Sequence, residues 1–330
     1  MHQKLGSHRW HRRAASLLLA LVMILDLAPG LPLAAGASAH WSDPYLSQMV
    51  EWGFIRADQA QKPDELLTRA DFMSIVNRAY GYHEPGETPF EDVVETDWFY
   101  DDVGIAYTAR YIKGTSPTTA SPGDTLTRET AATILGRNMM LQESAGEILD
   151  FSDAREISSW ARGTIKSSLE HYLVDGYDDG TFRPQKDLSW GEMASMVTRI
   201  VGTPIQEEGD YALGGVFGNV TISSPGVTLR DTIISGDLYV TGGVGLGNVK
   251  LENVTVLGRI IVSGTGESET GEASIVLRNV TADEMLVDNL QGNFVSVRAD
   301  GITEIGATTV RTSAYVEDNT PEGLGLKYIS

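Results

Sequence analysis

Residues Val174–Glu192 read VDGYDDGTFRPQKDLSWGE, a loop that leads directly into the start of a helix. Glycine, aspartate and proline crowd the first part of this stretch, which is typical of a tight loop. Ser189 is a favourable helix N-cap, and Glu192 three residues later completes a capping box. The apolar residues Met193, Met196 and Val197 then follow at helical spacing. The stretch therefore predicts a helix that begins at a fixed point behind an ordered loop.

The same loop and helix start recur with a period of about 60 residues. A tryptophan anchors each copy, and an aliphatic residue stands fourteen residues after it. The tryptophans are Trp41, Trp98 and Trp160, and the helix starts are Thr68–Asp71, Thr127–Thr130 and Ser189–Glu192. Each copy is predicted to be helix, loop, helix. The predicted boundaries are residues 40–83, 84–142 and 143–202.

These residues resemble the S-layer homology (SLH) domain in a set of three. The resemblance rests on Phe90-Glu91-Asp92-Val93, on the tryptophans, on Gly176–Pro184 and on the Thr-Arg element of the first two copies. It implies an α-helical bundle with pseudo-three-fold symmetry. It also implies that grooves between copies bind the secondary cell-wall polysaccharide attached to the peptidoglycan of Gram-positive walls, often through a pyruvylated sugar. An arginine of the Thr-Arg element is then expected to contact the acidic group.

The residues themselves agree with an acidic ligand. Arg69 and Arg128 stand at the first helical position, where the helix dipole and unsatisfied N–H groups favour an anion, and a guanidinium can bind a carboxylate with two hydrogen bonds. The alternative is an ordinary surface arginine paired with an acid. Copy three carries Trp190 instead, and copy one carries Ala57 where the others have glycine. The predicted polysaccharide-binding residues are Arg69, Arg128, Trp190, Trp41, Trp98, Trp160, Asp92, Asp153, Gly114 and Gly176, with the tryptophans either stacking on sugar or belonging to the core.

Residues 214–318 change to short β-branched runs separated by Gly, Asn or Asp. Residues 227–240 align with 249–262 at an offset of 22, and residues 275–281 repeat the pattern 26 residues later. Rungs of this length predict a parallel β-helix (β-solenoid), with an antiparallel sandwich as the alternative. Residues 203–213 are predicted to be a linker, and residues 319–330 a C-terminal tail or cap. The fold class is thus α + β, multidomain.

The alignment of rungs places Asp231, Asn253 and Asn279 at one corner of the solenoid. We expect these side chains to stack, with at least Asn253 and Asn279 forming an amide ladder. The alternative is three independent turn residues that tolerate left-handed backbone.

The first 39 residues have the layout of a secretory signal peptide. Basic residues at 2–13 precede an apolar run from Ala14 to Ala28, and Ala37-Ser38-Ala39 matches a cleavage site. The alternative is a membrane anchor, but the run is shorter than the roughly 20 residues of a bilayer span and contains Asp26. The sequence therefore predicts a secreted protein of the cell wall or surface, with no membrane span after cleavage.

Composition excludes several classes of function. The net charge of −20 disfavours nucleic acid as a partner, and the absence of cysteine excludes thiolate metal sites, disulfides and cysteine nucleophiles. Residues 214–330 contain no histidine or tryptophan, and Asp283, Glu284 and Asp288 are expected to be solvated rather than catalytic. No enzymatic activity, metal or cofactor is predicted.

The expected function is non-covalent anchoring of an exported protein to an acidic wall polysaccharide, with the solenoid displayed outward. Two alternatives stay open. The solenoid could be a polysaccharide-degrading enzyme tethered by the repeats, or the chain could self-associate through the solenoid as an S-layer structural protein.

Overall fold

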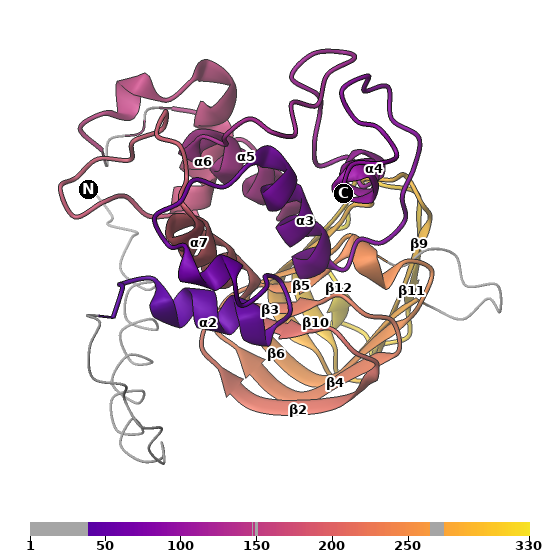
Figure 1. Ribbon diagram of the computed structural model, residues 1–330. Helices are drawn as coiled ribbons and strands as arrows, with labels where there is room; N and C mark the ends of the chain where they lie inside the picture. The colour runs from indigo at the N-terminus through magenta and orange to yellow at the C-terminus, as the bar shows by residue number, and fades with distance from the viewer. Residues whose placement is uncertain (1–38, 147, 149–150, 265–273) are drawn as a thin grey trace, which may run out of the picture. The chain divides into compact units, whose positions relative to one another are not determined.

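The helices of the computed structural model form three successive helix–loop–helix copies (Figure 1). The structure describes residues 39–146, 148, 151–264 and 274–330, and residues His40–Ser330 form one compact unit. The predicted signal peptide lies, except for Ala39, outside the described residues. The helices are α2 (Asp43–Glu51), η2 (Gln59–Gln61), α3 (Arg69–Tyr80), α4 (Tyr100–Thr108), α5 (Arg128–Asn138), η3 (Ala154–Glu156), α6 (Ser159–Glu170) and α7 (Trp190–Val201).

The second helix of each copy begins where the sequence predicts. Thr68 and Ser189 each accept the backbone N–H of the residue three positions later, and Asp71 and Glu192 return the bond, so both capping boxes are confirmed. Thr127 caps α5 through its side chain alone. None of the helices in the described residues combines the length and hydropathy that crossing a membrane requires.

The three copies close in a ring because each first helix packs on the second helix of the preceding copy. Helix α4 lies against α3, α6 against α5, and α2 of the first copy against α7 of the last. The resulting core is continuous from Leu46 to Val201. This cyclic exchange gives the bundle its pseudo-three-fold arrangement.

The strands form a parallel β-solenoid, as predicted. All the strand pairs given for the described residues are parallel. The predicted offsets are also observed, because Val227 pairs with Val249 and Val249 pairs with Ile275. The strands are β1 (Thr203–Ile205), β2 (Gly209–Val216), β3 (Val220–Ile222), β4 (Val227–Ile234), β5 (Leu238–Val240), β6 (Val249–Val262), β7 (Ile275–Arg278), β8 (Thr281–Val287), β9 (Val295–Asp300), β10 (Glu304–Val310), β11 (Ala314–Asp318) and β12 (Gly325–Leu326), with the short helix η4 (Gly242–Val244) between β5 and β6.

The predicted corner ladder is present. Asn253 Nδ2 donates to Asp231 Oδ1 (3.0 Å), and Asn279 Nδ2 donates to Asn253 Oδ1 (2.9 Å). All three residues have a positive φ near 50° (49°, 55° and 55°), so the stacked side chains and the left-handed turn occur together.

The predicted linker at residues 203–213 is wrong, because β1 and most of β2 lie in this segment and belong to the first rung. Pro204 is compatible with a strand here because β1 pairs only with β3, so its missing N–H faces an open edge. At the other end, β12 pairs with β10 and Ile329 bridges to Thr308. The tail at residues 319–330 thus adds strand pairing to the last rung.

One column of strands has both of its faces covered. This column, here called the third column, consists of β1, β3 and β5 followed by the last residues of β6, β8 and β10. Its inward side chains fill the solenoid, whereas Tyr239, Ile261 and Leu286 point into the core of the helical bundle. Four buried tyrosines meet at this boundary and are called the junction tyrosines: Tyr80, Tyr82, Tyr111 and Tyr239.

Candidate functional site

The loop of one copy covers the helix start of the copy before it. In each case, the N–H group of the first helical residue donates to a loop carbonyl of the next copy around the ring. The pairs are Arg69 to Asp124 (2.9 Å), Arg128 to Lys186 (2.9 Å) and Trp190 to Glu65 (3.0 Å). The expectation of free N–H groups at these positions is therefore wrong, since the neighbouring copy already binds them. An anion at a groove must be held by side chains.

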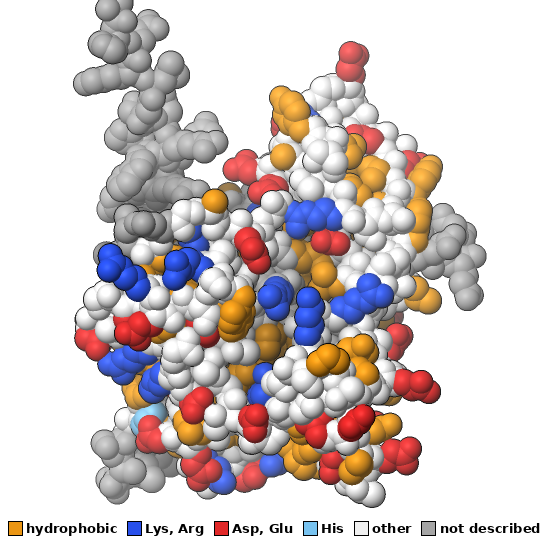
Figure 2. Space-filling model, turned by 90° about the horizontal axis from the view of Figure 1, so that it is seen from above, with side chains coloured by type: hydrophobic (Ala, Val, Ile, Leu, Met, Phe, Trp, Pro, Cys, Tyr) orange, Lys and Arg blue, Asp and Glu red, His pale blue; other side chains and the backbone are white. Residues whose placement is uncertain are grey.

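A groove of about 520 Å³ lies at the start of α5, where all three copies meet. Its walls come from Trp41 and Asp64 of the first copy, Arg128 of the second, and the loop and last helix of the third. Arg128, Lys186 and Arg199 bring positive charge into it. Figure 2 shows Lys and Arg side chains close together beside hydrophobic side chains on one face of this acidic protein.

Arg128 is a buried cation at the back of this groove, with a relative exposure of 7%. Its Nη2 donates to the carbonyl of Asp175 (2.5 Å), and its guanidinium lies 4.9 Å from the ring centroid of Tyr177 and 5.1 Å from that of Phe182. Its Nε has no hydrogen-bond partner among the described residues. Burial lowers the pKa of Arg128, although an arginine stays charged. The environment supplies carbonyl and aromatic contacts to this charge, and Glu192 and Asp175 favour it electrostatically, although neither forms a salt bridge with it among the described residues.

Tyr177 contacts several charged side chains of the groove. Its hydroxyl donates to Glu192 Oε1 (2.5 Å), and Lys186 Nζ donates to the same oxygen (2.5 Å). Arg183 covers the ring at 4.1 Å from its centroid. Burial and the bond to Glu192 raise the pKa of Tyr177. Burial alone would raise the pKa of Glu192, but the hydrogen bonds from Lys186 and Tyr177 leave it lowered. The tyrosine therefore stays protonated beside an ionised carboxylate.

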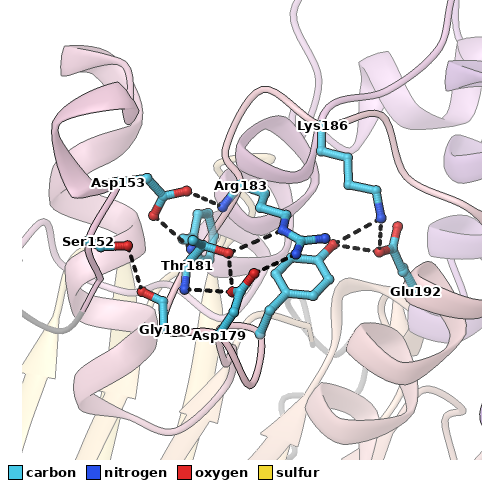
Figure 3. Close-up of polar contacts among 10 residues, drawn as sticks. Ser152, Asp153, Asp179, Gly180, Thr181, Arg183, Lys186 and Glu192 are labelled. Atoms are coloured by element: carbon cyan, nitrogen blue, oxygen red, sulfur yellow. Dashed lines mark hydrogen bonds and ion pairs between the residues drawn. The ribbon is translucent and has the colours of Figure 1, made fainter.

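Asp153 braces the loop that carries this cluster (Figure 3). Its two carboxylate oxygens accept the N–H groups of Phe182 (2.8 Å) and Arg183 (2.7 Å). Hydrogen bonds from Thr181 and Arg183 lower the pKa of Asp179 to about 2. Asp92 braces the equivalent loop of the second copy, because its two carboxylate oxygens accept the N–H groups of residues 120 and 121. The structure thus shows both predicted aspartates bracing loops, and neither of them lines the Arg128 groove.

The predicted glycines also have a packing role. A Cβ on Gly176 would collide with the ring of Phe151, and a Cβ on Gly114 would collide with that of Phe90. The first copy has no Phe-x-Asp-Val opening, which is why Ala57 is acceptable at the same position.

The second predicted arginine has a different environment. Arg69 Nε donates to the carbonyl of Ala120 (3.0 Å), and Asp124 and Asp92 are the charges that counter its burial. Where the Arg128 groove has Lys186 and Tyr177, this groove has Asp124 and Thr115 at the matching loop positions. The two arginines share a sequence motif, and each has two acids that counter its burial, Asp124 and Asp92 for Arg69 and Glu192 and Asp175 for Arg128.

The predicted tryptophans divide into two groups. Trp41, Trp98 and Trp160 are 56%, 63% and 48% exposed, and Trp41 lines the Arg128 groove. Trp190 is only 5% exposed and belongs to the helical core. Exposed indole faces suit sugar rings, so Trp41 is the aromatic residue that the structure brings to the groove.

Sequence analysis missed the roles of Lys186, Glu192 and Arg199 in the groove. Tyr177 and Glu192 do stand in the decisive stretch, as a loop aromatic and a capping acid. Their meeting depends on the fold of the loop, which spacing along the chain does not reveal.

Comparison with known proteins gives the same family as the repeats. The family model of the S-layer homology domain matches residues 89–132 and 150–194. Relatives include the surface-layer 125 kDa protein of Lysinibacillus sphaericus, 27% identical over 40% of this chain and 11% of its own length. The cellulosome-anchoring protein of Acetivibrio thermocellus is 31% identical over 35% of this chain and 25% of its own length. An endoglucanase of Bacillus sp. is 23% identical over 58% of this chain and 22% of its own length. The chain thus spans a quarter or less of the length of these relatives. The matches point to the cell surface.

Proposed function

Because residues 89–132 and 150–194 form S-layer homology domains, we propose that the chain anchors itself non-covalently to a secondary cell-wall polysaccharide carrying an acidic, pyruvylated sugar. One observation carries the proposal. Arg128 is a buried cation at an open groove, where Glu192 and Asp175 offset its burial but no carboxylate of the described residues forms a salt bridge with it. A buried charge without a directly paired counter-ion is costly, and a ligand carboxylate would reduce that cost.

The groove offers basic side chains for an acidic group and an aromatic side chain for a sugar ring. Arg128 would hold the carboxylate beside Lys186, which is itself ion-paired with Glu192, and Trp41 would pack on a sugar ring. Asp64, Asp175, Asp178, Asp187 and Glu192 also line the groove, so a polymer carrying dense charge would be repelled while an isolated acidic group would not. Binding is expected to weaken with added salt.

The Arg128 groove is proposed to be the principal site of the chain. Arg69 does not line this groove, and Trp190 has replaced the third arginine. One principal contact per chain is therefore proposed.

The solenoid is proposed to be non-catalytic, and the chain to be an accessory wall protein rather than a lattice subunit. Residues 203–330 contain no histidine. A second column of paired strands consists of β2, β4, the first residues of β6, then β7, β9 and β11. One of its side-chain rows begins with Asp210 on the first rung and ends with Glu317 on the last. A second copy stacked end to end would bring these like charges together, which disfavours growth of a filament.

The test is co-sedimentation of residues 40–330 with purified Gram-positive cell walls, before and after chemical removal of the secondary polysaccharide. The proposal predicts that the protein sediments with intact walls and stays in solution with stripped walls. Equal binding to both would show that peptidoglycan is the ligand and would refute the carboxylate mechanism.

A further inference from the structure

The solenoid side chains complete the ends of two helices of the bundle. Thr241 Oγ1 donates to the carbonyl of Tyr80, the last residue of α3, at 2.6 Å. Asn219 Nδ2 donates to the carbonyl of Ile200 (2.9 Å), and Thr221 Oγ1 donates to that of Val201 (2.8 Å), at the end of α7. The last carbonyls of a helix have no partner within it, so these bonds supply what the helices themselves lack.

The contact continues as a shared apolar core. Tyr239, Ile261 and Leu286 belong to the solenoid by strand pairing and to the helical core by packing. The ring of Tyr239 meets that of Tyr80 edge-on at 5.5 Å. Gly81 also approaches Ser223 and Gly243 so closely that a Cβ there would meet the Ser223 backbone. The boundary is packed like a protein interior and not like two domains joined by a linker.

The same two helices lead to the polysaccharide-binding side of the bundle. Ser189 and Glu192, at the start of α7, line the Arg128 groove, and Arg69 stands at the start of α3. Each helix has 12 residues and spans about 18 Å, so the groove and the solenoid lie at opposite ends of these helices.

We propose that the solenoid is the base of the wall-binding module, which holds α3 and α7 by their C-terminal ends and folds with the bundle as one cooperative unit. That the module binds the wall rests on the proposed function, whereas the cooperative folding of solenoid and bundle does not. The solenoid is therefore not an independent cargo on a tether, and its orientation relative to the groove is fixed.

The chain carries natural reporters for the two parts. All the tryptophans of residues 40–330 lie before residue 203, so their fluorescence follows the helical bundle, whereas far-UV circular dichroism follows the helices and the strands together. A solenoid that unfolds separately would therefore add a second step to the dichroism that the fluorescence lacks. In a urea titration of residues 40–330, the proposal predicts that both signals change with the same midpoint and slope. Two separated transitions would overturn it, and neither signal depends on a ligand.

A pair of matched substitutions tests the boundary directly. Thr241→Val removes the hydrogen bond to α3 together with the bond that the same hydroxyl accepts from the N–H of Gly243, whereas Thr221→Val removes only the bond to α7. Thr255→Val makes the same residue change on a strand face that the helices do not cover. Thr241→Val is expected to move the tryptophan midpoint and the dichroism midpoint downward together, and Thr255→Val to move both much less. A Thr241→Val variant whose tryptophan midpoint stays in place would contradict the proposal. Thr221→Val at α7 provides a second variant if Thr241→Val does not fold.

Discussion

Replacing Arg128 by methionine is predicted to weaken ligand binding strongly without unfolding the protein. Methionine has a similar length, and it keeps apolar contact with the rings of Tyr177 and Phe182. The substitution removes one charge-assisted hydrogen bond to the Asp175 carbonyl, which is worth about 1.5–3 kcal/mol. It also removes a buried charge whose desolvation costs several kcal/mol and whose Nε is unpartnered among the described residues. The free energy of unfolding is therefore expected to change little or to increase.

The effect on binding has the opposite sign. A charge-assisted bond between Arg128 and a ligand carboxylate contributes about 1.5–3 kcal/mol, so its loss weakens binding roughly 10- to 150-fold. Thermal unfolding and titration calorimetry with polysaccharide released from the wall measure the two quantities on the same sample. Arg69→Met is the matched control and should weaken binding much less, because Arg69 does not line the Arg128 groove.

Two results would refute this reasoning. A large fall in the unfolding temperature of Arg128→Met would mean that the arginine is structural. Unchanged affinity in a folded Arg128→Met variant would mean that the acidic group binds elsewhere.

Three further predictions follow from the packing. Gly176→Ala should lower the free energy of unfolding by about 1–3 kcal/mol in denaturant titrations, because the new methyl group collides with the ring of Phe151; an unchanged midpoint would contradict this. Asp153→Ala should cost about 1–3 kcal/mol by freeing two loop N–H groups, seen as faster hydrogen exchange in the loop; protection equal to the parent would exclude the bracing role. Burial raises the pKa of the junction tyrosines, that of Tyr239 to about 12. The free energy of unfolding should therefore be constant below pH 10 and should fall above it by about 1.4 kcal/mol per pH unit for each tyrosine. A free energy of unfolding that stays constant between pH 10 and 12 would contradict this prediction.

Features set by local chemistry were predictable from the sequence. The capping boxes at Thr68 and Ser189 need only residues three positions apart. The stacking of Asn253 and Asn279 follows from the repeat offset, since parallel rungs place equivalent residues above one another.

The junction was not predicted, although a signal was present. Leu238-Tyr239-Val240 and Ile260-Ile261-Val262 are apolar at every position, whereas a solenoid strand with one face in water alternates. Continuous apolar runs indicate a parallel sheet covered on both faces. The acidic, glycine-containing composition of residues 203–213 suggested a linker because composition does not reveal which partner strand a segment meets.

The site was predicted at the level of the motif and not of the groove. Arg69 and Arg128 occupy the same position in their copies, and spacing alone gave them equal roles. They differ because the groove opens at Arg128 and not at Arg69, and because the loop of the following copy carries Lys186 and Asp175 over Arg128 where it carries Asp124 and Lys113 at the matching positions for Arg69. Such a contact exists only after the ring has closed.

The central claim is that an acidic group on the wall polymer enters the Arg128 groove. The most direct measurement compares the affinity of residues 40–330 for purified secondary polysaccharide before and after removal of its pyruvyl groups by mild acid. The account predicts that affinity falls by about 10-fold or more when the carboxylate is removed, because Arg128 loses its counter-ion. Equal affinity for the two polymers would contradict it and would assign recognition to the neutral sugars.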